Sequence, residues 1–266
     1  MGSDVVAHLV WQDVKRNLRP IRALPPLFMA WAIAYDRFKF HNRIGTEQDF
    51  LYFAEGALSH HPYWLVTLVP IFAGVMSGSL AAERRMGITP SILSRGVSRR
   101  AYLVSKLLAA GASSAILTFG AILGFWAIIF TIWIPGRPRD LDPQWIEGPA
   151  KALFLYSPFL HDLLVALMEM IGAAGLSVIG VLAGLIVANE YVAMAATPIT
   201  LILVTVIMRQ VSDVLNPEEY LSLGYDFYWG PHFRWLIPFA PFLYWGTFAM
   251  VIYFVCQRIF AKKEIA

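Results

Sequence analysis

Residues 63–82 read YWLVTLVPIFAGVMSGSLAA, and none of these twenty side chains carries a charge. A helix of about 20 apolar residues is long enough to cross the roughly 30 Å hydrocarbon core of a bilayer. The run ends abruptly at Glu83, Arg84 and Arg85, where a helix leaving the membrane would meet water and headgroups. The stretch therefore predicts a membrane-spanning helix.

The composition of the whole chain agrees with a membrane protein. Of the 266 residues, 58% are hydrophobic and 15% are charged, which leaves too few polar side chains to cover a sizeable soluble domain. Five further apolar runs are long enough to span a bilayer. The six expected spans cover residues 24–40, 63–82, 107–134, 163–188, 192–208 and 236–256. We therefore expect an all-α integral membrane protein with six transmembrane helices, folded as one domain over residues 1–266.

The segment before the first span, residues 1–22, is expected to form an N-terminal interfacial amphipathic helix. Val6, Val10, Val14 and Leu18 recur at every fourth position, so they share one face of a helix while polar side chains take the other. The segment lacks the apolar core and small-residue cleavage site of a secretory signal, and we expect no part of it to be removed.

Two local patterns predict how the spans are connected. Thr46 and Asp49 resemble a capping box, which predicts a short surface helix within residues 41–62. Only residues 189–191 separate the fourth and fifth spans. A connection of this length predicts a tight helical hairpin.

The distribution of charge sets the expected orientation. With the N-terminus inside, the inner segments hold 13 Lys and Arg and the rest of the chain holds 8, whereas Asp and Glu number 5 inside and 12 outside. Lys and Arg accumulate on the cytoplasmic side of membrane proteins. We therefore expect a multi-pass protein of the cell (inner or cytoplasmic) membrane with both termini in the cytoplasm.

The most informative segment is the expected inner loop, residues 83–106, which reads ERRMGITPSILSRGVSRRAYLVSK. Thr89 with Pro90 predicts a helix start, Gly96 a break, and Ser98 a second N-cap. Six of its residues are Lys or Arg, and such charges can serve only to fix topology beside anionic headgroups. The two predicted caps instead favour a folded element, which topology alone would not require.

The order of residues in this loop resembles the signature of ABC-2 type permeases, the membrane subunits of ATP-binding cassette exporters. The positions that carry the resemblance are Glu83, Gly87, Thr89, Leu93, Ser94, Val97, Ser98, Arg99 and Lys106. The order of expected elements resembles that family over the full length. The resemblance implies a type V (ABC-2/ABCG-like) exporter fold, in which residues 83–106 form a coupling element on a separate ATPase. Glu190, in the short inner loop, is assigned to the same ATPase-coupling set.

The resemblance also implies partners. A permease of this kind pairs with a second copy or with a sister permease among membrane lipid, and works with separate ATP-binding cassette ATPase subunits. The chain contains no Gly-Lys dipeptide and hence no GxxxxGK[ST] loop to hold ATP phosphates. We therefore expect no enzyme activity and no cofactor in this chain, with ATP and Mg held by the partner ATPase. The net charge of +3 is small for a nucleic-acid binder, so no nucleic-acid partner is expected.

No metal site is expected. Cys256 is the single cysteine, which excludes a multi-cysteine cluster within one chain. His60 and His61 are adjacent, so their rings point apart in regular structure, and no Cys or carboxylate stands at ligand spacing beside them. We expect a solvated surface pair at these two histidines.

Three GxxxG pairs lie inside the expected spans. They are Gly74 with Gly78, Gly120 with Gly124, and Gly180 with Gly184. Such pairs let helix backbones approach closely. We favour packing within the bundle, although one pair could instead lie at a dimer seam.

Glu169 is a carboxylate inside the fourth span, where a charge is costly. It is a candidate for the substrate path, or else a protonated or paired group near the outer interface. Two other functions stay open. A polytopic membrane enzyme would use Glu169, His161, Asp162 and the outer histidine pair, although no spacing assembles them into a site. A permease-like subunit of an ATPase-driven maturation or assembly system for an outer metalloprotein would share the expected architecture.

Overall fold

The computed structural model describes residues 2–43, 68–132, 153, 156–212, 215–221 and 239–262. Within this part of the chain all regular structure is helical and no β-strand occurs, so the all-α prediction is confirmed. Three predictions lie outside the described residues. They are the short helix that Thr46 and Asp49 would begin, the His60-His61 pair, and the start of the span over residues 63–82.

The helical elements follow one another in a simple order. In the described part of the chain they are α1 (Gly2–Asn17), α2 (Pro20–Arg43), α4 (Val69–Ser77), α5 (Ser79–Arg85), α6 (Ile88–Ser94), α7 (Arg99–Ile132), α9 (Pro158–Ile186), α10 (Glu190–Val211), η4 (Pro217–Tyr220) and α11 (Ala240–Lys262). Four of them, α7, α9, α10 and α11, contain stretches long and apolar enough to cross a membrane. Their length and composition indicate a membrane protein.

The two expected spans nearest the N-terminus differ from the prediction. α2 is one helix that begins at Pro20 and contains Pro25 and Pro26, so it starts earlier than expected. The second expected span is described from residue 68 and is interrupted at Gly78, which separates α4 from α5. Neither belongs to the four candidates in the described residues, because α2 carries several charged side chains and α4 and α5 are both short.

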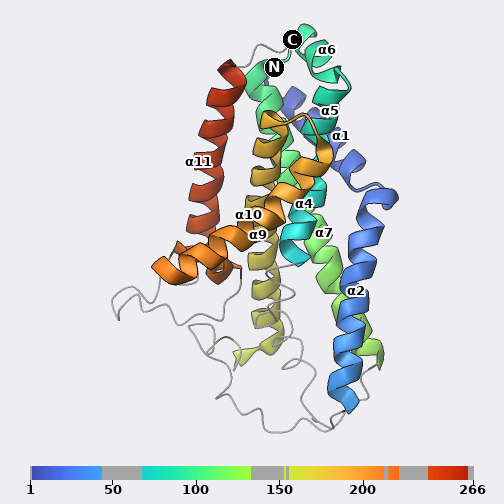
Figure 1. Ribbon diagram of the computed structural model, residues 1–266. Coiled ribbons are helices and arrows are strands. Elements are labelled where there is room, and N and C mark those ends of the chain that lie inside the picture. Colours follow the sequence, from blue (N-terminus) through green and yellow to red (C-terminus); the bar gives the residue numbers. More distant parts are fainter. Residues whose placement is uncertain are drawn as a thin grey trace.

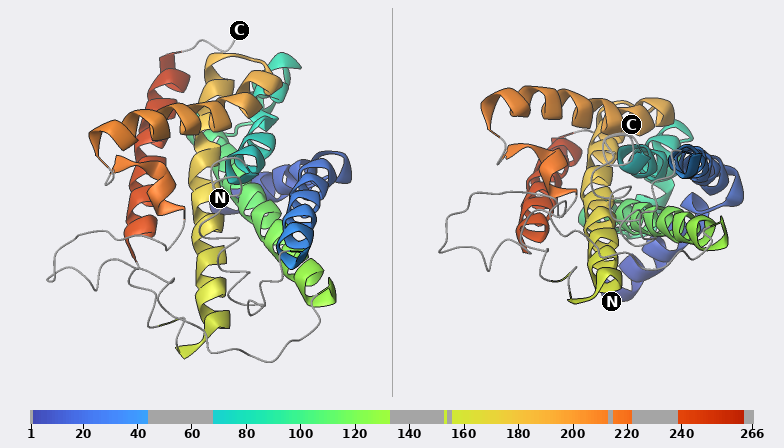
Figure 2. Two further views of the ribbon diagram at one scale, coloured as in Figure 1. Left: turned by 60° about the horizontal axis from the view of Figure 1, so that its bottom comes forward. Right: turned by 90° about the horizontal axis from the view of Figure 1, so that it is seen from below.

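α9 is the central helix of the bundle. It contacts α4, α7, α10 and α11, while α1 and α2 pack against α7. Both chain termini lie at the same end of the bundle, together with α6 (Figure 1). The connection between α9 and α10 is as short as expected. However, α10 runs across α9 instead of alongside it, as Figure 2 shows from two further directions. The two helices therefore cross and do not pack side by side as a helical hairpin.

The crossing of α10 over α9 follows from small residues beneath it. Asn189 is the N-cap of α10, because its Oδ1 accepts hydrogen bonds from the backbone N–H groups of residues 191 and 192 at 2.9 and 3.4 Å. A Cβ at Gly74 would collide with the carbonyl oxygen of Met194, and one at Gly180 would lie 2.8 Å from the carbonyl oxygen of Ala193. The backbone of α10 therefore lies directly on both α4 and α9.

The other GxxxG glycines also pack within the chain. Gly78 faces α10 and Gly184 faces α5, while Gly120 and Gly124 face α2. A Cβ at Gly124 would collide with the indole of Trp31. In this structure the glycines of all three pairs therefore face other helices of the same chain.

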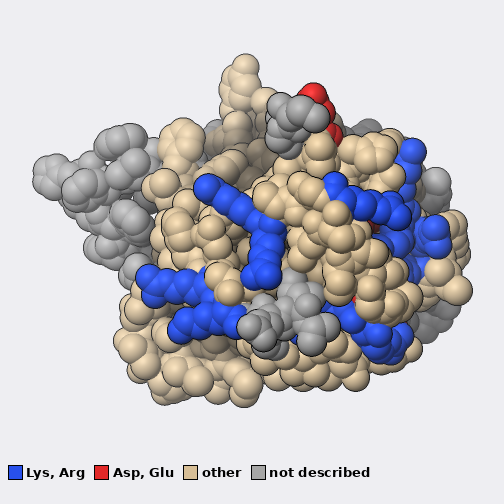
Figure 3. Space-filling model, turned by 90° about the horizontal axis from the view of Figure 1, so that it is seen from above, with Lys and Arg blue, Asp and Glu red and all other residues tan. Residues whose placement is uncertain are grey.

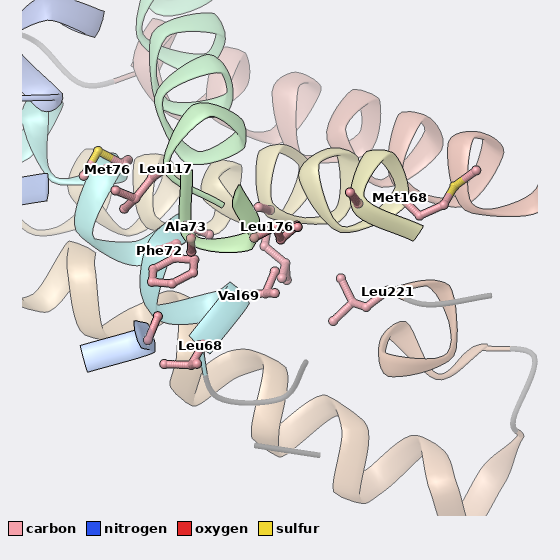
Figure 4. Packing of buried hydrophobic residues seen from close by; sticks show 14 of the residues in the cluster. Leu68, Val69, Phe72, Ala73, Met76, Leu117, Met168, Leu176 and Leu221 are labelled. Carbon is pink, nitrogen blue, oxygen red and sulfur yellow. The ribbon is translucent and has the colours of Figure 1, made fainter. Parts of the chain in front are cut away.

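α4 lies in the apolar core. Figure 4 shows the side chains that meet there. The labelled side chains are Leu68, Val69, Phe72, Ala73 and Met76 from the α4 segment, Leu117 of α7, Met168 and Leu176 of α9, and Leu221. All of them are almost fully buried. The lack of charge in this part of residues 63–82 therefore reflects burial among other helices.

Candidate functional site

α6 is a short helix held between two glycine turns. Gly87 has a φ of +67° and Gly96 a φ of +85°, a left-handed conformation that residues with a Cβ rarely adopt. Ser98 then caps α7, because its Oγ accepts a hydrogen bond from the backbone N–H of Ala101 at 3.1 Å. The predicted break at Gly96 and the predicted cap at Ser98 are confirmed, and residues 83–106 form a folded element.

A helix does start where Thr89 and Pro90 predict one, to within one residue, but Thr89 is not its cap. α6 begins at Ile88, directly after Gly87, and Thr89 is fully buried. Its Oγ1 lies 3.2 Å from the hydroxyl oxygen of Tyr102. Thr89 therefore makes a buried polar contact between α6 and α7 instead of capping a helix.

Two carboxylates and two cations meet in the interior next to α6. The Lys106 ammonium lies 2.6 Å from Asp13 Oδ2 and 2.7 Å from Glu83 Oε1. Arg16 donates a hydrogen bond to Glu83 Oε1 at 2.5 Å and forms an ion pair with Asp13 Oδ1 at 2.7 Å. The four formal charges cancel, and buried charges are tolerated when they are paired and hydrogen-bonded in this way.

Tyr102 extends this cluster to α6. Its hydroxyl donates to Glu83 Oε2 at 2.5 Å, so the Thr89 hydroxyl is left to donate to the Tyr102 oxygen. Lys106 Nζ also lies 5.0 Å from the centre of the Tyr102 ring, within the range of a cation–π interaction. We refer to Asp13, Arg16, Glu83, Thr89, Tyr102 and Lys106 as the Glu83 network. It joins α1, α5, α6 and α7.

The pKa values of the two carboxyl groups in the network are shifted in opposite directions. Burial alone would raise the pKa of Glu83, but the Lys106 ammonium and hydrogen bonds from Lys106 and Tyr102 hold that pKa below its usual value. For Asp13, burial outweighs the opposing effect of Lys106 and Arg16, and the pKa is raised. Glu83 therefore keeps its negative charge to a lower pH than an ordinary glutamate does, whereas burial favours the neutral form of Asp13.

Glu83 and Lys106 belong to the predicted coupling set, but the structure buries both side chains. Each of these residues is only 2% exposed, because the network encloses both side chains. Leu93 and Val97 are half-buried and pack against the cluster around Tyr102. The exposed members of the predicted coupling set are Gly87, Ser94, Ser98 and Arg99. A partner can therefore touch α6 and the start of α7, whereas Glu83 and Lys106 fix how α6 is attached.

Glu190 forms a second ionic contact at the same end of the bundle. Its carboxylate lies 3.3 Å from the Arg22 guanidinium and 3.1 Å from the Arg85 guanidinium, so it joins α10 to α2 and α5. An anion at the first position of α10 is also favourable to the helix dipole. Arg84 donates to the carbonyl oxygens of residues 184 and 185 at 2.8 and 2.5 Å, where α9 ends and leaves carbonyl groups without partners in the helix.

Asp13, Arg16 and Tyr102 were not expected as partners of Glu83. Asp13 and Arg16 stand three positions apart on α1, next to the buried Val14. Their position beside the apolar face of an amphipathic helix was the available signal for burial. Charged groups are rarely buried unless they are paired, so the same position also indicated that Asp13 and Arg16 would have ionic partners.

Three further titratable residues are buried in the first half of α9. His161, Asp162 and Glu169 are each 2% exposed or less, and His161 Nδ1 lies 3.5 Å from Asp162 Oδ1. Glu169 stands about two turns further along the helix. Among the described residues no group of three or more His, Cys, Asp or Glu could hold a metal ion. The structure thus brings His161 and Asp162 together and places Glu169 inside the bundle.

Comparison with protein-family models, with curated proteins and with solved structures gave no match to this chain. The residues and contacts described above are therefore the basis of the function proposed below.

Proposed function

We propose that the chain is the membrane-spanning permease subunit of an ATP-binding cassette export system, working as a dimer with separate ATPase subunits at its cytoplasmic end. The observation that carries this proposal is the attachment of α6 to the bundle. Met86, the C-cap of α5, and Ile88, the first residue of α6, are exposed, so a partner can reach them. Thr89 of the same helix connects through Tyr102 to Glu83. A force applied to α6 would reach three other helices through buried contacts.

The Glu83 network favours coupling over a role limited to topology. A loop that only marks the cytoplasmic side needs Lys and Arg in contact with water or headgroups. It does not need a lysine buried between two carboxylates, as Lys106 is. Chains of packed side chains and hydrogen-bond networks can carry energetic coupling between sites, and this network joins α6 to helices that continue into the bundle.

Six spans fit the course of the chain. Beyond the four candidate spans, α2 and the pair α4 and α5 would supply two further passes. In Figure 1, α2 leaves the end of the bundle that carries α6, α4 and α5 return to it, α7 leaves it again and α9 comes back, whereas α10 runs obliquely across the bundle from that end and α11 returns to it. α2 also exposes Leu24, Phe28 and Met29, as a helix in contact with lipid would. This course supports a type V exporter fold.

Charge at one end of the bundle supports a cytoplasmic placement of both termini. Lys and Arg side chains spread over the end that carries the termini and α6 (Figure 3). The exposed cations of α1, the α1–α2 connection, α5, the α6–α7 region and the end of α11 are Lys15, Arg19, Arg85, Arg95, Arg99, Arg100, Arg258 and Lys262. Asp13 and Glu83, by contrast, are buried. A surface of this sign is typical of the cytoplasmic side, where ATPase subunits would bind.

Crosslinking tests whether α6 contacts an ATPase. In a Cys256→Ala background, Ser94→Cys places a thiol on exposed α6, and Ser212→Cys places one after α10 as the matched control. The chain is co-expressed with an ATP-binding cassette subunit encoded in a neighbouring reading frame and treated with a short thiol-to-amine reagent. We expect a crosslinked product with the ATPase from Ser94→Cys and none from Ser212→Cys. No product from Ser94→Cys, or equal products from both, would contradict the proposal.

A further inference from the structure

Residues 15–22, which we call the α1–α2 connection, include the end of α1 and the start of α2 and contain four cations that divide into two pairs. Arg16 and Arg22 face inward, where both bond carboxylates. Lys15 and Arg19 are exposed, and neither takes part in a salt bridge within the part of the chain that the structure describes. Carboxylates of this chain therefore neutralise Arg16 and Arg22, the inward pair, whereas Lys15 and Arg19, the outward pair, can bind an anion from outside the chain.

Exposed apolar side chains adjoin the outward pair. Trp11 is 57% exposed, and Lys15 Nζ lies 4.8 Å from the centre of its ring. α2 then presents Ile21, Leu24 and Phe28 on its outer side, with Ile21 83% exposed. Ile21, Leu24 and Phe28 stand three and four positions apart and therefore share one face of α2, and Trp beside Lys is typical of the boundary between headgroups and acyl chains.

We propose that the α1–α2 connection binds an anionic phospholipid, with Lys15 and Arg19 at its headgroup phosphate and the exposed face of α2 along its acyl chains. A soluble anion would pair with Lys15 and Arg19 but would make no contact with Ile21 and Phe28. An acidic protein surface would have the same defect. A phospholipid with a net negative headgroup fits both parts of the surface, because its phosphate can pair with Lys15 and Arg19 while its acyl chains lie along the apolar face of α2.

The proposed lipid would also act on the Glu83 network. Lys15 and Arg16 are neighbours in α1, so a headgroup held outside by Lys15 fixes the helix that places Arg16 between Asp13 and Glu83. Anionic lipid would thereby stabilise the position of α1 against α7. This inference depends on the chain lying in a membrane and does not depend on the ATPase partner, so either proposal can fail without the other.

Lipid retention tests the inference on the purified full chain. Wild type, Lys15→Gln/Arg19→Gln, and the control Arg95→Gln/Arg99→Gln are purified into mixed micelles of phosphatidylglycerol and phosphatidylcholine. The control removes two exposed cations from the same end of the bundle. Native mass spectrometry then counts the phospholipids that stay bound, and thermal unfolding checks that each variant is folded.

The expected result is a selective loss. A basic side chain near an anionic lipid surface contributes about fivefold in affinity, so removal of Lys15 and Arg19 should weaken phosphatidylglycerol binding about thirtyfold. Phosphatidylcholine binding should not change, and the control should retain phosphatidylglycerol as the wild type does. If the double variant fails to fold, Lys15→Gln and Arg19→Gln alone should each lose about fivefold.

Three results would overturn the inference. Retention of phosphatidylglycerol by Lys15→Gln/Arg19→Gln at the wild-type level would show that these cations do not bind it. An equal loss in Arg95→Gln/Arg99→Gln would show that attraction is spread over the whole basic end. Displacement of phosphatidylglycerol by inorganic phosphate would show a site for soluble anions, whereas resistance to phosphate supports a lipid.

Discussion

Replacing Lys106 by methionine would remove the cation between Asp13 and Glu83 while nearly preserving the length of the side chain. The two buried carboxylates would then share Arg16 alone, and one negative charge would be left uncompensated. Removing one partner of a buried ion pair costs about 3–5 kcal/mol. In a domain of about 150–250 residues, 1 kcal/mol lowers the unfolding temperature by about 2–4 °C. Lys106→Met should therefore unfold on the order of 10 °C below the wild type.

A second substitution separates the effect of charge from that of packing. Glu83→Gln/Lys106→Met would leave Asp13 and Arg16 as a balanced pair, so this double variant should recover much of the lost stability. The assay is thermal unfolding in detergent followed by circular dichroism, with Lys262→Met, an exposed lysine on α11, as the matched control. Wild-type stability of Lys106→Met, or a double variant less stable than Lys106→Met, would refute the electrostatic reasoning.

Three further predictions concern the same fold. The pKa of Glu83 is lowered in the folded protein, so the ionised carboxylate stabilises the protein above the usual pKa of 4.5, and this stabilisation is lost as the pH falls through the lower folded-state pKa. In unfolding scans the wild type should therefore lose more stability below pH 4.5 than Glu83→Gln does. Equal losses in the two proteins would argue against this prediction. Gly74→Ala should lower the unfolding temperature because the new Cβ collides with Met194, whereas Gly246→Ala, which meets no atom, should not; identical unfolding of the two would show that α10 is not seated on α4. In intact cells a Cys256→Ala protein with Ser94→Cys should resist an impermeant thiol reagent and one with Ser212→Cys should react, and labelling of Ser94→Cys from outside would reverse the topology.

The features of residues 83–106 that depend on sequence neighbours could be predicted. Gly96 adopts the left-handed conformation of a helix break, and Ser98 caps the next helix as its place before Arg99 indicated. Both effects act within about one helical turn. Thr89 was assigned to the same local chemistry, but its hydroxyl bonds Tyr102 instead, because burial of α6 against α7 outweighed capping.

The ionic contacts could not be predicted, because they join distant parts of the chain. Asp13 and Lys106 are separated by 93 positions, and no local pattern fixes which helices meet. Glu83 and Lys106 were assigned to a coupling element without partners inside the chain, although charged residues are rarely buried unless they are paired. Their pairing partners on α1 are what make the burial tolerable.

The uncharged run at residues 63–82 had two physical explanations. A bilayer and a protein interior both exclude charge, so the pattern predicts an apolar environment without distinguishing them. α4 lies in the core, and the break at Gly78 separates it from α5. Gly78 was correctly associated with close packing, but the same glycine also interrupts the helix, which its spacing did not indicate.

Coupled activity of a reconstituted complex tests most directly whether residues 83–106 transmit the action of an ATPase. Tyr102→Phe removes the hydroxyl that joins Thr89 to Glu83. Tyr253→Phe removes a hydroxyl that bonds Arg100 and is the matched control. Under the proposed function, we predict that the Tyr102→Phe variant assembles with the ATPase and permits basal hydrolysis but loses most substrate-stimulated hydrolysis and transport, while Tyr253→Phe keeps both. Full coupled activity of Tyr102→Phe, or equal losses in the two variants, would contradict the account.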